Sequence, residues 1–201
     1  MGASIAVGAP AVGGVLQLAS ALEGQLGDQA DFAAVALGSN LGDSVARMVT
    51  AARALQQQAV PGSFRCSALF RTAPVGGPPG QPAFLNAVAL LQWQDSPERL
   101  LQQLQALEEA AGRQRLEHWG PRSLDLDLLW CGQAYRNTAP LQLPHPRLWD
   151  RRFVIEPLAQ LEPGLVPPGQ VISVASRLQQ LIARADEPPP QQLDAPDNWP
   201  G

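Results

Sequence analysis

The chain of 201 residues contains no lysine, because all 14 of its basic residues are arginine. A nucleotide-binding P-loop needs a lysine on the β and γ phosphates, and Schiff-base chemistry, including that of pyridoxal phosphate enzymes, needs a lysine amine. Both classes of protein are therefore excluded. Any anion that binds through permanently charged side chains must be bound by guanidinium groups.

Cysteine is scarce, and long apolar runs are missing. Cys66 and Cys131 stand alone, with no CxxC spacing and no histidine nearby, so we expect two packed apolar side chains and no zinc site. No apolar stretch approaches the roughly 20 residues that a membrane helix needs, and the first arginine, Arg47, comes too late for the basic start of a signal peptide. We therefore expect a cytoplasmic protein with no membrane contact.

The net charge is −4, which argues against a nucleic-acid partner. The length fits one domain, and we expect a monomer whose single catalytic domain covers residues 31–186. Residues 1–30 are rich in Ala and Gly and are expected to be an extension with at most one marginal helix. The alternative is that the start codon was assigned too far upstream and that these residues are not part of the protein. Residues 187–201 are Pro-rich and polar, and are expected to be a disordered tail.

Apolar periodicity divides the main domain into elements in the order strand, helix, strand, strand, helix, strand. Strands are expected over 31–38, 63–71, 86–94 and 123–130, and helices over 43–59, 95–112 and about 173–185. A short closing segment is expected within 154–171. This order predicts an α+β fold, a ferredoxin-like (split βαβ) sandwich with a mostly antiparallel sheet and helices on one face.

The most informative local pattern is the run LDLDL over residues 124–128. Alternate side chains of a strand share a face, so Asp125 and Asp127 are expected on one side and the leucines in the core. Two carboxylates held so close in a sheltered site need a cation between them. A pair of Mg²⁺ ions, which bind one or two carboxylates together with phosphate oxygens, would meet this need. The alternative is an ordinary solvated strand face.

Arginines gather around this strand. Between Arg113 and Arg152 lie seven arginines and only four carboxylates, which gives this stretch a charge of +3. Guanidinium groups beside paired carboxylates suit a metal-bound polyphosphate, because they donate pairs of hydrogen bonds to phosphate oxygens. The pattern favours a nucleotide site over the alternative, a set of surface arginines paired with acids from elsewhere in the chain.

Two further places carry weaker signals. Pro144 and Pro146 limit the directions in which the His145 ring between them can point, which would suit a binding role. A single histidine has a purely structural role about as often. Phe84 and Asn86 are expected two residues apart on one strand face, so a ring and an amide could address one flat heterocycle. An ordinary core position is the favoured alternative for Phe84.

Together these motifs resemble those of the 6-hydroxymethyl-7,8-dihydropterin pyrophosphokinase family of folate biosynthesis. The resemblance covers about residues 32–171 in the family's order, and the run WGPRSLDLD is far more specific than two aspartates alone. The matching segments are 36–43 (ALGSNLGD), 70–75 (FRTAPV), 81–86 (QPAFLN), 112–115 (GRQR), 119–127 (WGPRSLDLD) and 143–146 (LPHP).

The resemblance implies a ferredoxin-like, Mg²⁺-dependent enzyme that transfers pyrophosphate from ATP to the hydroxymethyl oxygen of the dihydropterin and releases AMP. It implies that Asp125 and Asp127 hold two Mg²⁺ ions, and that Arg113 and Arg122 are the catalytic arginines. The implied ATP-binding residues are Glu108, Arg113, Arg115, Arg122, Leu128, His145 and Arg151.

The resemblance also implies a pterin pocket, in which Phe84 and Phe153 stack on the ring and Asn86 bonds its edge. The other implied pterin-binding residues are Thr72, Ala73 and Val75. This sequence departs from the family pattern at Phe84, where many members carry Tyr, at Ala73, where Pro is common, and at His118, where Arg is frequent. Two other functions stay open at this point, namely a two-metal phosphoesterase and a nucleotide-sensing module without turnover.

Overall fold

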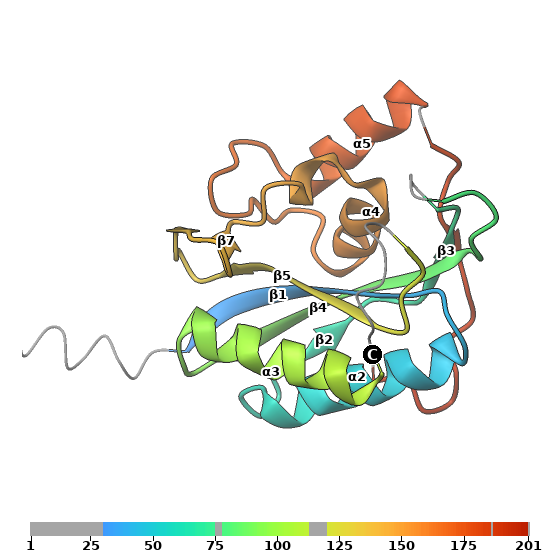
Figure 1. The fold of residues 1–201 in the computed structure, drawn as a ribbon. Helices are drawn as coiled ribbons and strands as arrows, with labels where there is room; N and C mark the ends of the chain where they lie inside the picture. The colour runs from blue at the N-terminus through green and yellow to red at the C-terminus, as the bar shows by residue number, and fades with distance from the viewer. Residues whose placement is uncertain (1–29, 75–77, 113–119, 186, 201) are drawn as a thin grey trace, which may run out of the picture.

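A six-stranded antiparallel sheet forms the centre of the molecule (Figure 1). A computed structural model describes residues 30–74, 78–112, 120–185 and 187–200, so nearly all of the expected N-terminal extension lies outside the described residues. The sheet order is β5-β1-β4-β3-β8, with β2 also paired to β4. The strands are β1 (Asp31–Ser39), β2 (Arg65–Cys66), β3 (Phe70–Thr72), β4 (Phe84–Trp93), β5 (Asp125–Cys131) and β8 (Gln191–Gln192), and β6 (Arg136–Asn137) and β7 (Gln142–Leu143) form a separate pair.

Helices cover both faces of the sheet. Helices α2 (Ser44–Gln58) and α3 (Pro97–Ala110) lie below it in Figure 1, whereas α4 (Arg152–Leu161), α5 (Val174–Arg184) and the short 3-10 helix η1 (Leu148–Asp150) lie above it. The α+β class and the antiparallel sheet are confirmed. The expectation of helices on one face holds only for α2 and α3, because α4 and α5 bury a second apolar cluster against the other face.

Side-chain size alternates along the central strand β1. Ala33, Val35 and Leu37 point into the larger core with α2 and α3. The residues between them are small, and Ala36 and Gly38 line a cavity on the α4 side. One face of this strand therefore supports a packed core, and the other leaves space above the sheet.

A short polar side chain caps the start of three helices. The Asp43 carboxylate accepts a hydrogen bond from the Ala46 N–H at 3.0 Å, and Ser96, directly before Pro97, accepts one from the Arg99 N–H at 3.2 Å. Ser173 caps α5 in the same way through the Ser176 N–H at 3.2 Å. These caps fix where each helix leaves its loop.

The segment expected to close the domain is a helix. In α4, Val154, Ile155 and Leu158 form a buried stripe with helical spacing, and the helix also accommodates Pro157 in its interior. Residues 154–158 hold four apolar residues and one acid, which is too short a pattern to distinguish a buried strand from a helix. This helix forms the roof of the cavity described below.

The C-terminal segment packs against the sheet edge, so the disordered tail expected from its composition is wrong for residues 187–200. Strand β8 pairs with β3, and the Leu193 N–H donates to the Leu69 carbonyl at 2.8 Å. The Trp199 indole N–H donates to the Ser67 carbonyl at 2.8 Å, and Leu193 and Trp199 pack against the core. Burial of Leu193 and Trp199 and pairing with the free edge of β3 offset the entropy cost of ordering this Pro-rich, polar segment.

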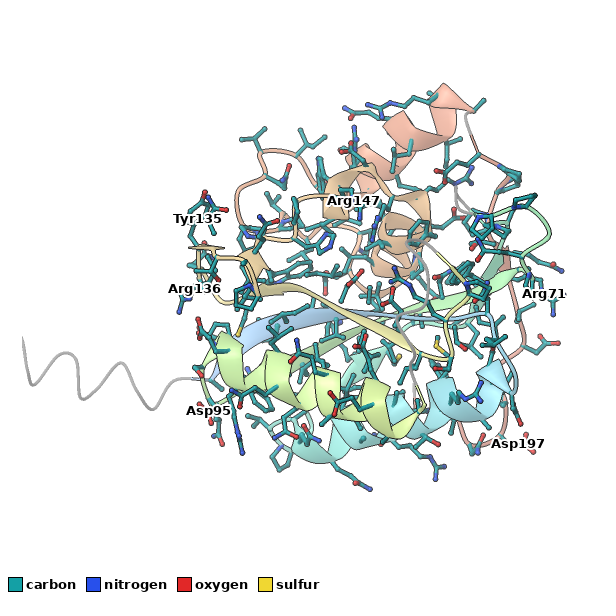
Figure 2. All side chains as sticks on the ribbon, viewed as in Figure 1. Arg71, Asp95, Tyr135, Arg136, Arg147 and Asp197 are labelled. Atoms are coloured by element: carbon teal, nitrogen blue, oxygen red, sulfur yellow. The ribbon has the colours of Figure 1, made fainter. Side chains whose placement is uncertain are left out.

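Replacing Trp199 with alanine should lower the free energy of unfolding by about 2 kcal/mol, because the change removes a large packed side chain and leaves a carbonyl without its donor. Tyr135→Ala is the matched control, since Tyr135 is 74% exposed at the far end of the molecule (Figure 2). Urea unfolding measures both variants. Equal midpoints for the two variants would show that the C-terminal segment adds nothing to stability.

No helix in the described ranges is both long and apolar enough to span a membrane. Cys66 and Cys131 are free thiols in the core, where burial raises the pKa of Cys66 to about 12 and that of Cys131 to about 11. Both thiols are therefore protonated and unreactive.

Candidate active site

A cavity of about 400 Å³ lies between the sheet and α4. Its floor comes from β1, β4 and β5, and its roof includes Phe153 and Val154 of α4. The end of β3 contributes Thr72, and the C-terminal segment contributes Glu187. Chain segments far apart in the sequence therefore meet around one space.

A row of paired residues crosses the floor. Gly38 pairs with Asn86 on one side and with Asp125 on the other, so the amide and the carboxylate flank a position without a side chain. A Cβ atom at Gly38 would lie 3.4 Å from the Asn86 Oδ1 and 3.8 Å from the Asp125 Cβ. The glycine thus keeps open the floor between these two polar groups.

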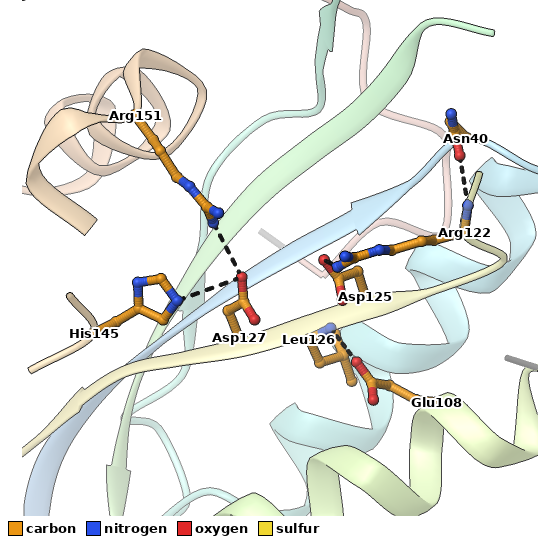
Figure 3. Close-up of polar contacts among 8 residues, drawn as sticks. All are labelled: Asn40, Glu108, Arg122, Asp125, Leu126, Asp127, His145 and Arg151. Atoms are coloured by element: carbon orange, nitrogen blue, oxygen red, sulfur yellow. Dashed lines mark hydrogen bonds and ion pairs between the residues drawn. The ribbon is translucent and has the colours of Figure 1, made fainter. Parts of the chain in front are cut away.

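Asp125 and Asp127 share the cavity face of β5, while Leu124, Leu126 and Leu128 lie in the core on the other face, as the alternation predicted. Each carboxylate has a cationic neighbour (Figure 3). Arg122 forms an ion pair with Asp125, and Arg151 donates to the Asp127 Oδ2 at 3.3 Å.

His145 also faces Asp127, with its Nε2 4.0 Å from the Asp127 Oδ2. The His145 Nδ1 accepts a hydrogen bond from the Arg147 N–H at 3.2 Å, so a neutral ring carries its proton on Nε2, toward Asp127. Burial, the largest influence, lowers the pKa of His145 below its ordinary value, and the ring is neutral at pH 7. Burial also lowers the pKa of Arg151, whose guanidinium lies 5.4 Å from the centre of the Phe153 ring.

Asn40 holds the segment that carries Arg122. Its side-chain Oδ1 accepts from the Arg122 N–H at 2.8 Å, and its own N–H donates to the Arg122 carbonyl at 3.0 Å. The Asn40 amide also donates to the Pro82 carbonyl at 3.2 Å. One buried amide therefore ties the segment before β5 to the segment before β4, and the backbone of Arg122 is positioned independently of its side chain.

The charges around the cavity nearly cancel. The described lining holds three guanidinium groups and four carboxylates, namely those of Arg122, Arg147, Arg151, Asp125, Asp127, Asp150 and Glu187. Asp150 is further neutralised by Arg177 at 2.8 Å. Binding of a polyphosphate therefore requires cations beyond those in this lining.

Divalent metal ions fit this donor set. Asp125 and Asp127 offer hard oxygen ligands on a rigid strand, which suits Mg²⁺ when phosphate oxygens and water complete its coordination. Within the described ranges, no group of three or more His, Cys, Asp or Glu side chains is arranged to hold a metal ion. The residues present therefore match a metal shared with a substrate better than a metal enclosed by protein ligands.

Comparison with known proteins identifies the family. The family model described as 7,8-dihydro-6-hydroxymethylpterin-pyrophosphokinase (HPPK) matches residues 34–163. The chain belongs to the HPPK family. It is 38% identical over 157 residues to the 2-amino-4-hydroxy-6-hydroxymethyldihydropteridine pyrophosphokinase of Synechocystis sp., covering 78% of this chain and 80% of that one. It is 39% identical over 138 residues to the protein of that name in Haemophilus influenzae, covering 69% and 86%.

Solved structures support the fold. A crystal structure of a Plasmodium falciparum HPPK-DHPS variant with SDX-DHP aligns with a TM-score of 0.60 over 78% of this chain, at 12% identity. This chain spans only 46% of that longer protein. At this identity the match shows that the HPPK domain shares its fold with the present chain.

The structure brings together the described residues that the resemblance assigns to a pterin pocket. Phe84 and Asn86 lie on the floor, Phe153 lies in the roof, and Val75 lies outside the described residues. The Asn86 amide donates to the Thr72 hydroxyl at 2.8 Å, which fixes its Oδ1 as the acceptor end of the side chain. The residues of this set that line the cavity are Thr72, Ala73, Phe84, Asn86 and Phe153.

The residues expected to bind ATP are more dispersed. Arg122 and Arg151 line the cavity, and Arg113 and Arg115 lie outside the described residues. The Leu128 side chain packs in the core. Glu108 is buried and accepts a hydrogen bond from the Leu126 N–H at 2.7 Å, which satisfies the outer edge of β5. A role near adenosine for these two residues stays a prediction.

Four polar residues at the cavity, Asn40, Arg147, Asp150 and Glu187, were not among the expected site residues. Asn40 lies within the matched segment ALGSNLGD, so its motif was an available signal. Arg147 and Asp150 follow the matched LPHP segment closely, and Arg147 lies above the sheet in Figure 2. Glu187 had no local signal, because its position depends on how the C-terminal segment folds back.

Proposed function

We propose that the chain transfers pyrophosphate from ATP to 6-hydroxymethyl-7,8-dihydropterin, giving AMP and the pterin diphosphate in folate biosynthesis. The observation that carries the proposal is one cavity, in a chain of the HPPK family, that joins the β5 carboxylates to an aromatic and amide pocket on β4. We propose that the predicted domain, residues 31–186, together with the C-terminal segment that packs against it, acts as a cytoplasmic monomer.

The cavity walls can position the two substrates. Phe84 from the floor and Phe153 from the roof offer ring faces for the pterin, and Asn86 offers an acceptor for its edge. Arg122 and Arg151 offer paired donors to the triphosphate on the β5 side. This arrangement holds the hydroxymethyl group near the phosphates and reduces the entropy cost of their encounter.

Asp125 and Asp127 would hold Mg²⁺, which neutralises phosphate charge when bound there. In the transfer, the hydroxymethyl oxygen forms a bond to the β phosphorus and loses its proton. The bond from the β phosphorus to the oxygen shared with the α phosphorus breaks, and AMP leaves with that oxygen. Neutral His145 points its Nε2–H toward the Asp127 Oδ2, 4.0 Å away, so the ring lies next to the proposed metal site without adding a charge to it.

One assay separates this function from the two alternatives. The full chain is incubated with ATP, Mg²⁺ and 6-hydroxymethyl-7,8-dihydropterin, and nucleotides are resolved by chromatography. We expect AMP that depends on the pterin, is lost on chelation with EDTA and returns with added Mg²⁺. Phosphate release without pterin would indicate a phosphoesterase, binding of ATP without turnover would indicate a sensing module, and ADP as the product would contradict pyrophosphate transfer.

Replacing Gly38 with valine should raise the KM for the pterin at least about tenfold, because the new side chain fills the floor between Asn86 and Asp125. Valine suits a β-strand, so the melting temperature should not fall. Gly164→Val is the matched control, since nothing lies within 4 Å of a Cβ at Gly164. Steady-state kinetics and thermal melts measure both variants. An unchanged KM in Gly38→Val would show that the pterin does not bind on the floor between Asn86 and Asp125.

A further inference from the structure

Arg177 is buried although it carries a permanent charge. It lies on α5, is only 6% exposed, and stands three residues after Val174 and four before Leu181, which are both buried. Helical spacing therefore puts a guanidinium group on the face of α5 that packs against α4, where an apolar side chain would be buried at lower cost. A charge at such a position is stable only when its hydrogen-bond donors are bonded.

Three acceptors bond this guanidinium group. The Arg177 Nε donates to the Trp149 carbonyl at 2.7 Å, and its Nη2 donates to the Asp150 Oδ1 at 2.8 Å. Its Nη1 donates to the Gln180 Oε1 at 3.0 Å, within α5. Two of the three contacts thus go to the last two residues of η1. Arg177 therefore connects α5 to the short segment that leads into α4.

The end of η1 has few other restraints. A 3-10 helix of three residues is weak by itself, and neither η1 nor α4 has a side-chain hydrogen bond at its N-cap among the described residues. The Asp150 N–H donates to the Arg147 carbonyl at 3.4 Å, which is long for a hydrogen bond. The shorter bond from Arg177 to the Trp149 carbonyl therefore restrains the point where η1 turns into α4.

Arg151 follows directly after this point. Its guanidinium lines the cavity and lies 3.3 Å from the Asp127 Oδ2. Because one residue separates Trp149 from Arg151, a backbone change at residue 149 shifts that guanidinium relative to Asp127. In Figure 1 α5 lies farther from the sheet than α4, and no residue of α5 is in the described lining of the cavity. Arg177 therefore acts on the cavity only through the segment that it holds.

From these contacts we propose that Arg177 is a positioning residue. By holding the end of η1, it fixes the Arg151 guanidinium beside Asp127, where the triphosphate of ATP binds. The inference rests on the proposed function and adds α5 to the elements that the reaction needs. Arg177 lies outside residues 34–163, to which the family model is matched, so family membership assigns it no role.

The pterin side of the cavity should not depend on Arg177. Val154, Ile155 and Leu158 pack α4 into the core, and they hold the helix that carries Phe153. Loss of Arg177 should therefore weaken the binding of ATP more than the binding of the pterin. A role in stability alone would affect both substrates to the same extent.

Arg177→Met removes the donors and keeps most of the side-chain volume. We expect the KM for ATP to rise about tenfold in this variant, with the KM for the pterin within twofold of wild type. The Asp150 side chain is 67% exposed, so it stays hydrated when its partner is lost. Arg184→Met, at the exposed end of α5, is the matched control and should leave both KM values unchanged.

A double-mutant cycle tests whether Arg177 acts through Arg151. Titration calorimetry with Mg²⁺ and α,β-methylene-ATP, in which carbon replaces the oxygen of the bond proposed to break, measures affinity without turnover. We expect about a tenfold loss in Arg177→Met, and at most a twofold further loss when Arg177→Met is added to Arg151→Met. Losses that multiply in the double variant, or an equal rise of both KM values with a lower melting temperature, would overturn the positioning role.

Arg177→Lys keeps the test decisive if the methionine variant does not fold. Lysine keeps the charge but lacks the planar fork that reaches the Trp149 carbonyl and the Asp150 carboxylate together. We expect about a threefold loss of affinity that disappears in the Arg151→Met background. No loss, or a loss that persists in that background, would overturn the proposal. Absence of AMP formation by the wild type would instead refute the proposed function, because the cycle needs no turnover.

Discussion

Changing Asp127 or Asp125 to asparagine should lower kcat by about a thousandfold or more, because each change removes a charged ligand from the proposed Mg²⁺ site and metal ions stabilise several kcal/mol of transition-state charge. The fold should survive, since both side chains face the cavity and the adjacent leucines supply the core packing. Pterin-dependent AMP formation measures kcat, and circular dichroism checks the fold.

Asp31→Asn is the control for these two variants, because Asp31 is an exposed carboxylate at the other end of β1 and should leave kcat within twofold. A shared metal site also predicts that the Mg²⁺ concentration at half-maximal rate rises in the two cavity variants and not in the control. If Asp127→Asn and Asp125→Asn turned over at near wild-type rates with normal Mg²⁺ dependence, neither carboxylate would hold the metal.

Much of this site was predictable because β5 has a strict period. The alternation of Leu and Asp fixes which face carries each side chain once residues 124–128 form a strand, and no long-range information is needed. The helix caps at Asp43, Ser96 and Ser173 were predictable for the same reason, since a cap is a contact between residues only three apart.

The roof and the far wall of the cavity were not predictable in this way. The short apolar run around Val154 and Ile155 fits a buried strand as well as a helix, and only its packing against the sheet distinguishes them. The C-terminal segment folds back because β3 offers an unpaired edge and the core accepts Trp199. Neither condition is visible in the composition of residues 187–201.

Family resemblance and structure also give different kinds of information about a residue. The match at Leu128 identified a position, whereas the structure places its side chain in the core on the face opposite the carboxylates. A conserved-looking motif residue can act through its backbone or through packing, and a sequence pattern does not separate these roles. Arg151 is the opposite case, because its side chain lines the cavity and contacts Asp127, although its assignment to the nucleotide stays a prediction.

The second large effect is expected from Arg122→Ala, which should lower kcat about a hundredfold. Removing one preorganised donor to developing charge costs about 3 kcal/mol of transition-state stabilisation in other enzymes. The backbone should stay in place, because Asn40 holds both the N–H and the carbonyl of residue 122. Steady-state kinetics measure the loss, and Arg65→Ala, which breaks an exposed ion pair with Glu162, should leave kcat within twofold.

Arg122→Lys tests what the guanidinium supplies. In the structure Arg122 pairs with Asp125, so its contribution could be either charge neutralisation of that carboxylate or paired hydrogen bonds to a phosphate. Lysine keeps the charge but not the planar pair of donors. We expect Arg122→Lys to recover less than a tenth of wild-type kcat, because the proposed contact is a two-bond contact to the transferring group. Full recovery of kcat in Arg122→Lys would show that Arg122 only neutralises the charge of Asp125. The phosphate contact would then have to come from another cation.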